Sequence, residues 1–152
     1  MATAARGLND HALILYGRGV SFRPEHAREI HHRTREWFSR EIPRARDEAD
    51  VVIVMTHHAP VPEANPPQYQ EGPLSASFVS DMRQDILDWE PDVWAWGHTH
   101  HSFQGTLGHT LLLSAQRGYI GHEPGADLFK PAVIEIKGRE GVASVRSVRE
   151  QP

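Results

Sequence analysis

The chain has 152 residues, the size of one domain with a buried core, and we expect a single domain over residues 1–152. Hydrophobic residues make up 39% and charged residues 24%, which excludes a disordered chain, and the absence of cysteine excludes disulfides and thiolate metal sites. The net charge is −4 without a basic block, which argues against nucleic acid as a partner. The sequence contains neither a signal-peptide core nor an apolar run of membrane-spanning length, so we expect a cytoplasmic protein.

The amino-terminal part predicts a strand followed by a helix. The apolar run HALILYG, residues 11–17, has the composition of a strand or a strand-like segment. A helix is predicted over 21–42, because Ser21 can act as its N-cap, Pro24 suits its first turn and Pro43 ends it. Its apolar residues recur at three- and four-residue spacing and include Ala27, Ile30, Trp37, Phe38 and Ile42.

A second strand and helix follow. The β-branched run VVIVM, residues 51–55, is typical of a strand buried on both faces, and Pro60 prevents it from continuing far. Residues 61–77 form a long proline-rich loop, and loops of this length are usually functional or mobile. A helix then begins near Ser80 or Asp81. Its predicted buried side contains Met82, Ile86, Leu87 and Trp89.

The next strand, DVWAWG, ends at Gly97 and is followed by three histidines in four residues. Alternation of strands and helices implies parallel strands, whose carboxyl ends meet at one edge of the sheet. We therefore expect His57 and His58, after the earlier strand, to lie beside His98 and His100.

Two hairpins are predicted in the last third of the chain. SFQGTLGHTLLLSAQ reads as two strands joined near Leu107 and Gly108, and residues 131–148 read as a second hairpin that turns through Lys137 to Gly141. We expect these antiparallel strands to extend the sheet.

The Gly-His-x-His pattern has a metal-binding logic. Glycine permits a sharp turn, and residues two apart in an extended segment point to the same side, so His98 and His100 are expected to face one site while His101 points away. Neutral imidazole is a common metal ligand, and His57 would add a third nitrogen. The alternative for each residue is a hydrogen-bonded or surface histidine.

VVIVMTHHAP followed by VWAWGHTHHSF resembles the last two motifs of the calcineurin-like metallophosphoesterase family. The similarity extends over roughly residues 7–136. The resemblance implies a two-metal site for Mn, Fe or Zn ions, in which His57 and His98 share one ion and His100 reaches the second. It also implies hydrolysis of a small-molecule phosphoester by water activated between the metals.

The resemblance covers only the carboxyl-terminal half of the family's site. The Asp-x-His, Gly-Asp-x-x-Asp and Gly-Asn-His motifs, which supply the bridging carboxylate and further ligands, do not occur in the sequence, and Asp10 before His11 lacks the required spacing. Two metals about 3.5 to 4 Å apart need such a carboxylate to offset their repulsion. We therefore expect an incomplete α/β fold, a layered sheet with flanking helices and terminal hairpins. A late start codon or deletion, a split enzyme and a degenerate domain all remain open.

The functional expectation is a phosphoester hydrolase domain that is inactive or nearly so by itself. The missing part would come from a separate amino-terminal half or from a homodimer formed through the exposed sheet edge. His58, Arg117 and Tyr69 are candidate substrate contacts. The alternative is a catalytically inactive metal-binding or protein-interaction module.

Overall fold

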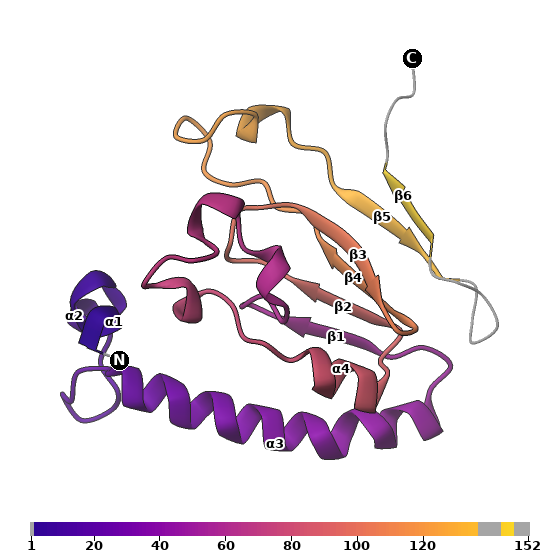
Figure 1. Cartoon of the computed structure of the whole chain (residues 1–152), viewed down its shortest axis with the longest axis horizontal. Coiled ribbons are helices and arrows are strands. Elements are labelled where there is room, and N and C mark those ends of the chain that lie inside the picture. Colours follow the sequence, from indigo (N-terminus) through magenta and orange to yellow (C-terminus); the bar gives the residue numbers. More distant parts are fainter. Residues whose placement is uncertain (1, 137–143, 148–152) are drawn as a thin grey trace.

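A computed structural model describes residues 2–136 and 144–147 and shows a four-stranded sheet with helices packed beneath it (Figure 1). The strands of this sheet are β1 (Ile53–Thr56), β2 (Val93–Trp96), β3 (Phe103–Leu107) and β4 (Thr110–Ser114). Their spatial order is β1-β2-β4-β3, with β1, β2 and β4 parallel and β3 antiparallel to β4. The mixed α/β class expected from the sequence is confirmed.

The helices are α1 (Ala2–Gly7), α2 (Asp10–Leu13), α3 (Pro24–Glu48) and α4 (Arg83–Trp89). Short 3₁₀ turns break up the longer connections: η1 (Pro62–Ala64), η2 (Pro67–Tyr69), η3 (Ser75–Ser77) and η4 (Ala126–Leu128). The long α3 runs beneath the sheet, and α1 and α2 lie at the end toward which β1 and β2 point (Figure 1).

The main core lies between the sheet and α3 with α4. Val54, Trp94 and Leu112 form one row across three strands, and all three are buried. The Trp94 ring meets Phe38 of α3 edge-on, with ring centroids 5.7 Å apart, and its Nε1 donates to Thr56 Oγ1 at 3.0 Å. Burial of large apolar side chains with the indole N–H satisfied is the main favourable term here.

The expectation that the first strand of the sheet is buried on both faces is wrong. Ile53 is 50% exposed and Met55 is 78% exposed, while Val54 between them is buried. The reason is that β1 is an edge strand and α3 and α4 cover only the face that carries Val54. A β-branched run therefore does not distinguish a central strand from an edge strand with one open face.

The predicted end of the first long helix before Pro43 is also wrong, since α3 continues to Glu48. Its N-cap is Arg23 and not Ser21, with Pro24 in the first turn as expected. Proline removes one helical hydrogen bond, but Ile42 is buried and Ala45 packs on the core, so tertiary contacts hold the helix together across Pro43.

Two smaller expectations, a strand over residues 11–17 and the burial of Leu87, are wrong. Residues 11–17 form no strand: α2 covers the first of them, and Leu15 makes an isolated antiparallel bridge to Ser21. Leu13 is 77% exposed, so its apolar character reflects no burial. Met82, the N-cap of α4, and Ile86 and Trp89 within the helix are buried as expected, but Leu87 is 42% exposed.

The hairpin of β3 and β4 is confirmed and extends the sheet, with Gly108 in the turn at φ 58°. The second hairpin pairs β5 (Ala132–Glu135) with β6 (Ser144–Ser147) as expected, but it forms a separate two-stranded sheet. The two strands of a hairpin hydrogen-bond to each other, so a hairpin pattern in the sequence does not show that the strands join a larger sheet. The predicted turn at 137–141 lies outside the described residues. Within the described helices, none is long and apolar enough to cross a membrane.

Candidate metal centre

The first group of histidines lies at the carboxyl ends of β1 and β2. These strands are parallel with Thr56 opposite Trp96, and Gly97 N donates to the His57 carbonyl at 3.2 Å. The centroids of the His57 and His98 rings lie 4.6 Å apart, and those of the His58 and His98 rings lie 4.7 Å apart. Parallel pairing thus brings together histidines some forty positions apart, as the alternation of elements predicted. We call His57, His58 and His98 the His98 cluster.

Phe78, at the end of the proline-rich loop, packs over His98. Its ring stacks on His98 with centroids 4.7 Å apart and planes at 18°. The backbone holds it there, because Ala59 N donates to the Phe78 carbonyl at 3.2 Å and Ser80 N donates to the Ala59 carbonyl at 2.9 Å. The loop is therefore anchored directly after the histidines of β1.

Burial favours the uncharged forms of His98 and His58. It lowers the pKa of His98 to about 4, with the neighbouring His58 and His57 adding to the effect. The pKa of His58 is also lowered, first by burial and then by His57. Asp10 acts in the opposite direction on both His58 and His98, so a carboxylate from α2 faces this end of the sheet. Neutral imidazole is the form that coordinates metals.

His100 has different neighbours. The segment after Gly97 is not extended, because His98 has φ 70° and His100 has φ 50°. The prediction that both rings face one site assumed an extended backbone, and this assumption is wrong. The His100 Nδ1 lies 2.6 Å from Glu123 Oε1, and the Tyr119 ring meets the His100 ring edge-on at 4.5 Å.

Gln116 connects the histidine turn to the segment that follows β4. Its Oε1 accepts a hydrogen bond from His100 N at 2.6 Å, and its Nε2 donates to Thr99 Oγ1 at 2.8 Å and to the His101 carbonyl at 3.1 Å. The same amide nitrogen lies 2.7 Å from Ser114 Oγ. We call His100, Gln116, Tyr119 and Glu123 the His100 site.

A family model, that of the calcineurin-like phosphoesterases, matches residues 4–102, a range that runs from α1 through both histidine segments. The chain belongs to the calcineurin-like phosphoesterase family. No curated protein and no solved structure matches it. Family members generally bind divalent metals.

The donor set fits part of a divalent metal site and not a complete two-metal centre. The adjacent imidazoles of His57 and His98 have the right chemistry for ions such as Zn²⁺ or Mn²⁺, and the lowered pKa of His98 favours its neutral form. Across residues 2–136 and 144–147, however, no three His, Cys, Asp or Glu side chains are grouped so that they could hold a metal ion. His57 and His98 lie together, whereas His100 contacts Glu123 and Tyr119. The charge that two close cations require is not supplied.

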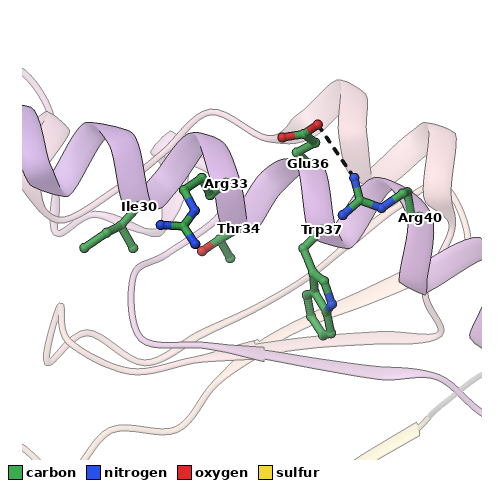
Figure 2. A pocket seen from close by; sticks show the side chains of 6 residues that line it. All are labelled: Ile30, Arg33, Thr34, Glu36, Trp37 and Arg40. Atoms are coloured by element: carbon green, nitrogen blue, oxygen red, sulfur yellow. Dashed lines mark ion pairs between the residues drawn. The ribbon is translucent and has the colours of Figure 1, made fainter.

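The remaining candidate residues lie on the surface of the chain. Arg117 is exposed in the segment after β4, and Tyr69 is 61% exposed in η2. A separate surface hollow lies on α3, where Arg40 pairs with Glu36 at 3.6 Å (Figure 2). Its lining comes from one helix and consists of Ile30, Arg33, Thr34, Glu36, Trp37 and Arg40. None of the predicted ligands lines this hollow.

Sequence reasoning missed the side chains that hold the histidines in place. Phe78 falls at the end of an irregular loop, and nothing in its spacing assigns it to His98. Gln116 and Glu123 flank the segment in which only Arg117 was singled out. The available signal was Gly118 and Gly121, which indicate a turn, but a turn does not say which side chain it brings back.

Proposed function

We propose that this chain forms part of the metal centre of a phosphoester hydrolase and that His57, His98 and His100 are ligands of divalent ions, with Mn²⁺, Fe²⁺ or Zn²⁺ as candidates. One observation supports the proposal most strongly: the centroids of the His57 and His98 rings lie 4.6 Å apart at the ends of two parallel strands. The different contacts of His100, which faces Glu123 and Tyr119, support a division of labour in which the pair binds one ion and His100 the other.

Each side chain has a role in this proposal. Bound divalent metals lower the pKa of water and neutralise charge on a phosphoester. His98 stays unprotonated and presents a lone pair, because Phe78 and the neighbouring rings disfavour a charge there, and His57 beside it is the second donor. His58, in the same cluster, and the exposed Arg117 and Tyr69 are the proposed contacts to a small phosphoester.

The edge strand β1 supports the proposal that a second polypeptide completes the site. Its outer edge is unpaired in the described sheet, and Ile53 and Met55 expose apolar surface on its open face. Such an edge favours addition of another strand. The occupant we propose is a chain that carries the absent carboxylate motifs, and the other candidate is a second copy of this chain, with residues 1–152 acting as one domain in either case.

A non-catalytic metal-binding or protein-interaction module is the second candidate function. It is favoured by two observations: no complete ligand group exists in the described part of the chain, and the bridging-carboxylate motif is absent from the sequence. Such a module would bind one ion through the His98 cluster and hydrolyse nothing.

Calorimetric titration with Zn²⁺ and Mn²⁺, together with hydrolysis of a chromogenic phosphodiester in Mn²⁺, tests these proposals. We expect metal binding that is weakened in His57→Ala and His98→Ala and unchanged in His101→Ala, with hydrolysis near background. Absence of metal binding would overturn the ligand assignment. Robust turnover by the chain alone, lost in His98→Ala, would overturn the expected need for a partner.

A further inference from the structure

We propose that Glu123 is a positioning residue for His100: its carboxylate holds the proton on Nδ1 and leaves Nε2 as the nitrogen with the free lone pair. Glu123 Oε1 lies 2.6 Å from His100 Nδ1. An ionised carboxylate only accepts hydrogen bonds, so Nδ1 is the donor. A neutral imidazole carries one proton, and Nε2 is then left without one.

Gly118 gives the Glu123 side chain the room to reach His100. Gly118 has φ +72°, and a Cβ placed on it would lie 2.1 Å from Glu123 Oε2 and 2.9 Å from Glu123 Cδ. The carboxylate therefore rests directly against the glycine backbone. Glu123 N donates to the Tyr119 carbonyl at 3.0 Å, and this tight turn brings residue 123 back over residue 118. Any side chain at position 118, even that of alanine, would displace the Glu123 carboxylate.

The rest of the His100 site fixes the ring and backbone that Glu123 engages. Gln116 Oε1 accepts from His100 N at 2.6 Å, which sets the position of the residue. The Tyr119 ring meets the imidazole edge-on at 76°, which limits its rotation. Glu123 then decides which nitrogen carries the proton. The backbone, the ring plane and the tautomer of His100 are thus set by three different side chains.

The consequence for metal binding rests on the proposed function. If His100 is a ligand, it coordinates through Nε2, and the negative charge of Glu123 on the opposite nitrogen makes that ligand more basic. Carboxylate partners of this kind orient a ligand before the metal arrives. Removing Glu123 would therefore weaken metal binding without removing any ligand.

A metal-free NMR experiment tests the tautomer directly. In ¹⁵N-histidine-labelled protein at about pH 8, above the usual imidazole pKa of about 6.5, we expect His100 to be protonated on Nδ1. Glu123→Ala and Gly118→Ala should both shift the population toward protonation on Nε2. Glu123→Gln retains an acceptor oxygen and should shift it less, while Asp127→Ala, an exposed carboxylate of the same segment, should leave it unchanged. Protonation on Nε2 in the wild type, or no change in Glu123→Ala, would overturn the proposal.

Zn²⁺ titration of the same proteins separates this role from the proposed function. We expect Glu123→Ala to lower Zn²⁺ affinity by about 10- to 100-fold, as loss of a carboxylate behind a metal-bound histidine typically does. Equal affinity in wild type and Glu123→Ala would overturn the role of Glu123 toward metal. A wild type that binds no Zn²⁺ but shows the expected tautomer would overturn the proposed function and leave the positioning role of Glu123 standing.

Discussion

His98 and His100 are two residues apart in the sequence, yet the His98 cluster and the His100 site control their imidazoles by different physical means. In the His98 cluster, Phe78 and the neighbouring rings partly bury His98, whereas His57 and His58 remain exposed, and no hydrogen bond to a ring nitrogen of the cluster occurs in the described structure. In the His100 site, Glu123 and Gln116 hold the residue through polar contacts. His98 is kept neutral by partial burial, and His100 is oriented by hydrogen bonds. Substitutions should therefore separate the two.

The largest effect is expected from Phe78→Ala. Removing a half-buried ring that packs on the core and on His98 should lower the free energy of unfolding by about 2 kcal/mol, below the 3 to 5 of a fully buried phenylalanine. It should also let water reach His98 and raise its pKa. Urea denaturation and an NMR pH titration measure the two effects. Phe78→Leu retains the apolar cover, so an equal pKa rise in that variant would contradict burial as the cause.

On the other side of the comparison, Gln116→Ala should lower the free energy of unfolding by about 1 to 2 kcal/mol, since it leaves several polar groups of the histidine turn without their partner. Chemical denaturation measures this loss. The His98 pKa should not move, because Gln116 touches none of the rings in the His98 cluster. Gln104→Ala, at an exposed position of β3, is the matched control and should have little effect.

Stability of the metal-free protein should fall between pH 6.5 and about 4 because of His98. The folded-state pKa is lower than the unfolded one, so in this window the unfolded chain binds more protons and acidification favours it. Below about 4 both states are protonated at this residue and its contribution stops changing. Urea unfolding at several pH values measures the slope. His98→Gln should have a shallower slope, and an unchanged slope would show that other groups produce it.

The smallest effect is expected from Asp10→Asn. Asp10 raises the pKa of His58 and His98 against the larger influence of burial, so neutralising it should lower both pKa values slightly further. NMR titration of the two rings measures this. Asp47→Asn, at an exposed position near the end of α3, should leave them unchanged. A rise in either pKa after Asp10→Asn would contradict the placement of α2 beside the cluster.

Patterns local to the chain predicted the order of elements and the meeting of His57 with His98. Apolar runs followed by a proline or glycine located β1 and β2, and parallel pairing then required their ends to coincide. The β3–β4 hairpin was equally readable from Gly108 between two apolar runs. These features depend on neighbours in sequence and on a small set of allowed connections.

The failures have a common origin in contacts between distant residues. Pro43 reads as a helix end until the packing of Ile42 against the core is known. Met55 reads as buried until β1 is known to lie at an edge. The two ligand candidates of the Gly-His-x-His segment read as one group until a carboxylate 23 positions after His100 is found beside it. Periodicity carries no information about any of these partners.

The positive φ angles of 70° at His98 and 50° at His100 restrict which residue types fit at these positions, independently of metal binding. Side chains branched at Cβ are the least tolerated in this left-handed conformation, whereas glycine and asparagine adopt it readily. A saturation scan of these two positions scored by protein abundance should therefore accept Gly and Asn and reject Val and Ile. The same scan scored by metal content should accept histidine alone. Substitutions that keep abundance but lose metal then separate the conformational requirement of the backbone from the need for a ligand.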